Sequence, residues 1–232
     1  MFTLLVVGIV TATPARATIS HGQVDDFQPD PNGNSNNFGW GPGFKAVVEE
    51  DAGPNGSGDD ALLVTDGLVR HGSLDIGTDP SSTDQWNGDW TAEGVTGVRM
   101  DVRNTNDFDL VLKLGLAGED GPNAFFAGDT YLSANAIVVP ADNTWHTVLF
   151  DVTLAGWTNY SGSDIEKALR KVTHLRVIHN LGTGSPPEFK GGGGEMYLDN
   201  ITAVPEPGAL VLLTLGSLSS LFVGRCSKRR RV

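Results

Sequence analysis

Residues 98–116 read VRMDVRNTNDFDLVLKLGL, and this stretch decides the fold class. On each side of its polar middle, apolar residues recur at every second position, a period that is typical of half-buried strands. Those from Val98 to Val102 share one face of a first strand, and the leucines from Leu110 to Leu116 share one face of the next. The segment 104–107, Asn-Thr-Asn-Asp, has a turn composition. The sequence therefore predicts an antiparallel hairpin here.

The same alternation continues through the rest of the body. Further strands are predicted at residues 23–27, 44–49, 61–65, 136–139, 145–152, 174–179 and 195–203. Only residues 164–171 are expected to be helical, with Ser163 capping the first turn. About nine strands with one short helix describe an all-β protein, a jelly-roll β-sandwich.

Composition limits what this body does. The chain has 232 residues, and its two apolar ends are expected to be targeting segments, which leaves one domain at residues 18–203. Without the basic residues of the ends, the body has ten basic and 27 acidic residues, a net charge of about −17. Such a surface repels phosphate backbones, so we expect no nucleic-acid partner. The only cysteine, Cys226, lies in the C-terminal tail, so the body has no disulfide.

The N-terminus has the features of a secretory signal peptide. An apolar run from Phe2 to Val10 is followed by Ala15-Arg16-Ala17, a small-x-small cleavage site. We expect residues 1–17 to be the signal peptide. The alternative is a buried first strand of the domain.

The C-terminus, residues 204–232, has three parts. Pro205, Glu206 and Pro207 come first, and the uncharged, mostly apolar residues 208–224 are just long enough to cross a bilayer as a transmembrane helix. The basic tail follows, consisting of Arg225, Lys228, Arg229, Arg230 and Arg231. Basic residues prefer the cytoplasmic side, so both ends of the sequence predict a body outside the membrane.

These three parts resemble the PEP-CTERM sorting domain, over about the last thirty residues. The resemblance implies processing by an exosortase, a membrane enzyme that cuts near the Pro-Glu-Pro motif and transfers or releases the body. The chain is then anchored in the inner membrane only transiently and ends at the cell surface or outside the cell. A plain tail anchor is the alternative.

The order of segments within the body carries a second resemblance. Residues 24–27, Val-Asp-Asp-Phe, open the domain, a strand at 145–152 follows the middle, and residues 197–201, Tyr-Leu-Asp-Asn-Ile, close it. This order resembles the galactose-binding-like jelly roll of many carbohydrate-binding modules. The resemblance implies a closing strand beside the opening one, often a structural calcium ion, and sometimes a glycan site on a loop end or a concave face.

Two aromatic patches are candidate glycan sites. Trp86 and Trp90 lie in a polar loop, and Trp157 and Tyr160 lie in a second polar segment. Sugar rings stack on exposed aromatic faces while nearby Asn, Asp and Gln side chains bind the hydroxyl groups. The alternative is that these rings close the ends of the sandwich. Trp145, at the start of an alternating strand, is expected in the core.

The candidate calcium ligands are Asp26 and Asp199. Calcium takes carboxylate and carbonyl oxygens, and pairing of the first and last strands would bring these two residues together. For each acidic cluster taken alone, a solvated turn is the alternative.

The sequence therefore predicts an exported, non-catalytic surface or extracellular-matrix protein that binds polysaccharide. Its expected partners are an exosortase, an extracellular polysaccharide and, before processing, the membrane. One alternative is a structural or adhesive protein without glycan binding. Another is a glycan hydrolase or lyase, although no nucleophile motif or paired carboxylates stand out.

Overall fold

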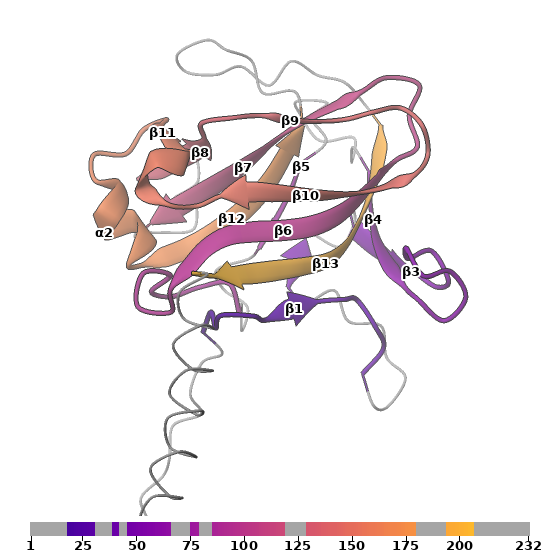
Figure 1. The fold of residues 1–232 in the computed structure, drawn as a ribbon, viewed down its shortest axis with the longest axis horizontal. Coiled ribbons are helices and arrows are strands. Elements are labelled where there is room, and N and C mark those ends of the chain that lie inside the picture. The colour runs from indigo at the N-terminus through magenta and orange to yellow at the C-terminus, as the bar shows by residue number, and fades with distance from the viewer. Residues whose placement is uncertain are drawn as a thin grey trace, which may run out of the picture.

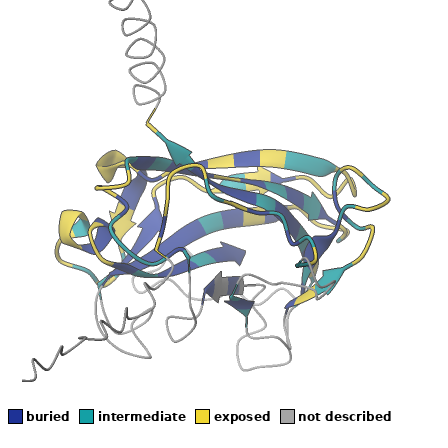
Figure 2. Ribbon diagram, turned by 90° about the horizontal axis from the view of Figure 1, so that it is seen from below, coloured by how far each residue is buried: buried dark blue, intermediate teal, exposed yellow. Residues whose placement is uncertain are grey.

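The computed structural model describes residues 18–30, 39–41, 46–65, 75–78, 85–118, 129–179 and 194–206. Two antiparallel β-sheets pack face to face over this part of the chain, as Figure 1 shows. Most of their buried residues lie between the two layers, while exposed residues concentrate on the outer faces and loops (Figure 2). The prediction of an all-β jelly-roll sandwich is confirmed.

The first sheet contains both the opening and the closing strand. Its strand order is β10-β6-β13-β4-β3, and β1 pairs with β13 beyond the end of β4. The strands are β1 (Val24–Asp25), β3 (Ala46–Glu49), β4 (Ala61–Thr65), β6 (Val95–Asn104), β10 (Trp145–Asp151) and β13 (Glu195–Pro205).

The second sheet has the order β11-β8-β7-β12-β5-β2, with β9 paired to β7. Its strands are β2 (Trp40–Gly41), β5 (Asp75–Thr78), β7 (Leu110–Gly118), β8 (Thr130–Ser133), β9 (Ile137–Val139), β11 (Trp157–Asn159) and β12 (Val172–His179). The 3-10 helix η1 (Leu154–Gly156) and the α-helix α2 (Ile165–Leu169) lie between β10 and β12 along the chain.

The hairpin predicted between residues 98–102 and 110–116 is wrong. Strand β6 belongs to the first sheet and β7 to the second, so their apolar faces meet across the core and not side by side. The buried Asn104 side chain organises the crossing: its Nδ2 donates to the carbonyl oxygens of Phe108 at 2.9 Å and of Val139 at 3.0 Å. Its Oδ1 accepts the backbone N–H of Asn106. The turn composition therefore marks a change of sheet.

The pairing of the first and last strands is confirmed. Val24 lies opposite Thr202, and Asp25 lies opposite Ile201. Because β13 also pairs with β6 along most of its length, the closing strand is central in its sheet.

The helix is shorter than predicted. It spans Ile165–Leu169, and Asp164, not Ser163, is its N-cap, with the carboxylate accepting the backbone N–H of Lys167 at 3.1 Å. Strands β2, β5, β8 and β11, each of four residues or fewer, were not predicted.

Both predicted targeting segments, residues 1–17 and 208–224, lie outside the described residues. Within the described part of the chain, no helix is long and apolar enough to cross a membrane.

Candidate polysaccharide-binding face

The structure places Trp86 and Trp90 in the core, fully buried. Trp86 packs between Trp40 and Trp90, with ring centres 6.2 and 6.1 Å away. The prediction that these two indoles offer exposed faces to sugar is therefore wrong, and the alternative, rings that close an end of the sandwich, describes their burial.

A buried carboxylate explains how a polar loop comes to lie inside. Asp25 Oδ2 accepts the indole N–H groups of Trp40 at 2.8 Å and of Trp86 at 2.6 Å. The Gln85 side-chain amide also donates to Asp25, and Trp90 donates to the carbonyl oxygen of Trp86 at 2.9 Å. Because the indole N–H groups and the Gln85 amide find acceptors inside, the three rings fill the core without leaving these donors unpaired.

The second predicted patch is divided between two surfaces. Trp157 is buried, and its indole N–H donates to the carbonyl oxygen of Val152 at 3.1 Å. Tyr160 is half-buried and packs against Leu132 and Ile178, on the second sheet. Together with the burial of Trp86 and Trp90, this separation leaves no shared aromatic surface among the four candidates.

A different set of side chains forms a row across the outer face of the first sheet. Backbone register places Trp145 of β10 opposite Arg103 of β6, Arg103 opposite Tyr197 of β13, Tyr197 opposite Leu63 of β4, and Leu63 opposite Val47 of β3. Side chains directly opposite one another in a sheet lie on the same face. We call these five residues the outer row.

Aromatic rings and a guanidinium group pack together in the outer row. The guanidinium carbon of Arg103 lies 4.1 Å from the centre of the Tyr197 ring and 5.4 Å from that of Trp145. The centres of the Trp145 and Tyr197 rings are 6.4 Å apart, and the planes of the two rings are inclined at 69° to each other. Such contacts between a cation and ring faces hold the side chains in one arrangement before any ligand arrives.

Glu49 of β3 extends this arrangement at the far side of Tyr197. The Tyr197 hydroxyl donates to Glu49 Oε2 at 2.8 Å. Burial raises the pKa of Tyr197, and the hydrogen bond and negative charge of Glu49 raise it further. The phenol therefore stays protonated and orients the carboxylate.

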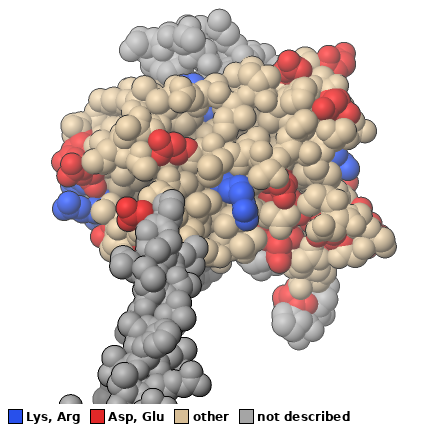
Figure 3. Space-filling view, viewed as in Figure 1, with Lys and Arg blue, Asp and Glu red and all other residues tan. Residues whose placement is uncertain are grey.

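Strands β10, β6 and β13 face the viewer in Figure 1, and Figure 3 shows from the same side that neutral surface predominates there while charged groups are scattered. Arg103, Tyr197, Trp145 and Glu49 are all partly exposed. Ring surface for the faces of sugars, a guanidinium donor and a carboxylate acceptor are therefore combined on one side of one sheet.

Sequence reasoning placed Trp145 in the core, which is wrong. The buried residues of β10 are Val148 and Phe150, so every odd-numbered position of this strand, from Trp145 to Asp151, faces outward. The parity of the alternation was the signal that could have identified Trp145. The same parity turns Arg103 and Tyr197 outward, but only the strand order shows that they lie beside Trp145.

Asp199 lies in β13, two residues after Tyr197, and belongs to the same sheet. Its side chain is fully buried, and its carboxylate accepts the backbone N–H of Asn200 at 2.7 Å and the Asn200 side-chain amide at 3.0 Å. Burial raises its pKa to about 7; Asn200 opposes the shift, and the charges of Asp59, Asp101 and Asp26 add to it. Asp26 and Asp199 are thus close enough to influence each other electrostatically.

Carboxylates gather here, but they do not converge on one point. Among the described residues, no group of three or more His, Cys, Asp or Glu side chains is arranged to hold a metal ion. Asp59 turns its oxygens toward neutral donors, namely the side chains of Gln28 and Asn55. The donor chemistry suits calcium, although carboxylates alone do not supply a complete ligand set.

Comparison with known proteins agrees with this architecture. Residues 203–231 match the PEP-CTERM protein-sorting motif. This signal indicates an exosortase substrate, and it implies export and sorting to the cell surface. No curated protein sequence matches the chain.

Solved structures with similar folds include carbohydrate-binding modules. An exo-β-agarase matches at a TM-score of 0.50 and 13% identity, over 81% of this chain but only 26% of the agarase. The family 11 carbohydrate-binding module of a cellulosomal cellulase of Clostridium thermocellum matches at 0.47 and 13%, over 82% and 97% of the two chains. The family 30 module of another cellulosomal cellulase of the same organism matches at 0.45 and 14%, over 82% and 98%.

At these identities the likeness establishes the fold alone. Its two packed sheets place the protein in the class of jelly-roll β-sandwiches. This particular chain joins such a sandwich to a PEP-CTERM sorting signal at residues 203–231.

Proposed function

We propose that the protein is a non-catalytic cell-surface or extracellular-matrix protein that binds a neutral polysaccharide through the outer row. The observation that carries the proposal is the packing of Arg103 against Tyr197 and Trp145 on one partly exposed sheet face. Sugar rings stack on the exposed parts of the two aromatic rings, and their hydroxyl groups bond to the guanidinium and to Glu49.

Charge favours a neutral ligand. The body has far more acidic than basic residues, with a net charge of about −17 over residues 18–203. A polyanion would approach against this field, which salt would only partly screen. Ring stacking and hydrogen bonds to hydroxyl groups require no charge on the ligand.

Retention of the sandwich, residues 18–206, in gels containing single polysaccharides tests the proposal. We expect at least one neutral polysaccharide to slow the protein, and Trp145→Ala to reduce its affinity by about tenfold, as loss of a central aromatic contact typically does. Val138→Ala is a matched control, because Val138 is 57% exposed on the second sheet. No retention on any polysaccharide, with or without calcium, would overturn the proposal.

The structural or adhesive alternative predicts a different result in the same experiment. The gels then show no retention, while the protein associates with itself in solution. Sedimentation of the wild-type sandwich over a range of concentrations distinguishes this alternative from an inert protein.

The hydrolase or lyase alternative is weakened by the position of Asp199. Its pKa, raised to about 7, resembles that of a general acid in a glycosidase. Its side chain is nevertheless fully buried, so no glycosidic oxygen can reach it. An assay for released reducing ends, run on any polysaccharide that the sandwich retains, checks this alternative directly.

A calcium ion held by Asp26 and Asp199 forms a separate part of the proposal. Burial raises the pKa of Asp199 and the negative charges of Asp59, Asp101 and Asp26 raise it further, and a divalent cation would offset that repulsion. A complete site would also need carbonyl or water oxygens as ligands. The unfolding temperature should rise with excess calcium over chelator, and Asp199→Asn should reduce that rise. Equal unfolding temperatures with excess calcium and with chelator would show that the folded protein binds no calcium.

A further inference from the structure

The closing strand of the sandwich runs into the sorting motif. Pro205 is the last residue of β13 and pairs with Val95 of β6. The backbone N–H of Glu206 then donates to the carbonyl oxygen of Gly94 at 2.9 Å. The first two residues of Pro205-Glu206-Pro207 are therefore held by the folded body.

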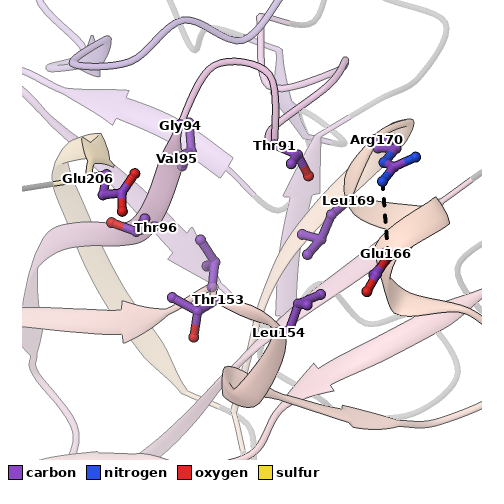
Figure 4. A pocket seen from close by; sticks show the side chains of 11 residues that line it. Thr91, Gly94, Val95, Thr96, Thr153, Leu154, Glu166, Leu169, Arg170 and Glu206 are labelled. Atoms are coloured by element: carbon purple, nitrogen blue, oxygen red, sulfur yellow. Dashed lines mark ion pairs between the residues drawn. The ribbon is translucent and has the colours of Figure 1, made fainter. Parts of the chain in front are cut away.

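Two hollows border this held segment. One has a volume of about 270 Å³ and is lined by Leu154, Leu169 and Glu206 among others (Figure 4). The other, of about 480 Å³, is lined by Leu149, Val204, Pro205 and Glu206 among others. Glu206 lines both hollows, so the sorting motif forms part of the surface of each.

Two leucines beside these hollows are exposed. Leu149 is 58% exposed and Leu154 is 50% exposed. Apolar side chains that gather around a hollow typically mark an interaction site. We call Leu149, Leu154, Val204, Pro205 and Glu206 the junction surface.

We propose that the junction surface docks the extracytoplasmic face of the exosortase. The occupant follows from distance. An extended residue spans at most about 3.6 Å, so a bond within three residues after Pro207 lies within roughly 15 Å of Glu206. A stable protein contact covers about 800 Å² on each partner. An enzyme that cuts this bond with a contact of that size would therefore also cover Leu149 and Leu154. Apolar side chains on the enzyme match this surface.

Docking to the exosortase can be tested separately from glycan binding. The rate of processing reports on the junction surface, and retention in polysaccharide gels reports on the outer row. The alternative is that the end of β13 opens and the enzyme reads Pro-Glu-Pro as a free peptide. Opening breaks the Glu206 to Gly94 hydrogen bond and the pairing of Pro205 with Val95.

Pulse-chase labelling of the full-length chain, in cells that process it, tests the proposal. Leu149→Ser combined with Leu154→Ser should slow conversion to the processed form at least about fivefold, as loss of central apolar contacts does at other interfaces. Val138→Ser is the control, since Val138 is equally exposed but lies on the other sheet. It should leave the rate unchanged, and the processed forms should show unaltered unfolding midpoints.

A linker variant keeps the proposal falsifiable if the serine variants misfold. Six Gly and Ser residues inserted between Val204 and Pro205 move the motif away from the body. Docking predicts slower processing of this variant, whereas equal or faster processing shows that the motif is read as a free peptide. Unchanged processing of the double serine variant also overturns the proposal. A further outcome would overturn it: the wild-type sandwich binds phosphatidylglycerol vesicles and the double serine variant does not. Leu149 and Leu154 would then contact lipid and not the enzyme.

Discussion

Asp25 Oδ2 lies 2.6 Å from the indole Nε1 of Trp86, joining residues that are 61 positions apart. Both side chains are fully buried. The contact ties the opening strand to the loop that closes one end of the sandwich. It therefore gives the tryptophan-rich loop a structural role at a site where the sequence indicated a ligand.

Replacing Asp25 should be strongly destabilising. Asp25→Ala leaves the indole N–H groups of Trp40 and Trp86 without their acceptor, and each unpaired buried donor costs about 1–3 kcal/mol. We expect the free energy of unfolding in urea, followed by tryptophan fluorescence, to fall by at least about 3 kcal/mol. The exposed Asp107→Ala is the matched control. Equal midpoints for the two variants would contradict the assigned role.

The turn that carries the chain between sheets gives a second prediction. Asn104→Leu keeps the side-chain volume but removes both donors that reach the carbonyl oxygens of Phe108 and Val139. We expect a loss of about 2–4 kcal/mol in the free energy of unfolding, because one buried and one partly buried carbonyl oxygen lose their donor. The neighbouring exposed Thr105→Ala should change it by less than about 0.5 kcal/mol. A result for Asn104→Leu within that range would show that the turn forms without the amide.

The successes and failures of sequence reasoning have a common cause. Alternation identified which face of each long strand is buried, as at Leu112 and Met100, because that choice depends on neighbours along the chain. It did not identify which strands pair, so it joined β6 to β7. It also misjudged Trp86, because the polar partner that makes its burial favourable, Asp25, is distant in sequence. The outer row was missed for the same reason.

The pH dependence of stability should reveal Asp199. Its pKa is raised to about 7 in the folded state, above the ordinary value of 3.8. The folded state therefore holds a proton that the unfolded state releases, so its contribution to stability is complete at low pH and is lost as pH rises through 7. With chelator present, we expect this contribution to increase by about 2 kcal/mol from pH 7 to pH 5.5.

Asp199→Asn provides the comparison for this measurement. The variant should show a flatter dependence of the unfolding free energy between pH 5.5 and pH 8 than the wild type, because the group that titrates is gone. Parallel curves for the two proteins would mean that Asp199 is ionised throughout this range.

The aromatic ring and the hydroxyl group of Tyr197 should contribute differently to glycan affinity. Tyr197→Phe removes the hydrogen bond to Glu49 but keeps the ring against Arg103. We expect affinity in polysaccharide gels to fall about threefold for phenylalanine and about tenfold for alanine, because stacking requires the ring. Equal losses in the two variants would instead assign the effect to the hydroxyl and to the orientation of Glu49.

The course of β13 has a mechanical consequence. This one strand carries Tyr197 near its start and the sorting motif at its end, and it is hydrogen-bonded to β6 along one side and to β4 and β1 along the other. A protein held by its tail and pulled at the outer row carries tension along this central strand. Slippage requires hydrogen bonds on both sides to shear together, so a cell-surface tether at this end would resist force well.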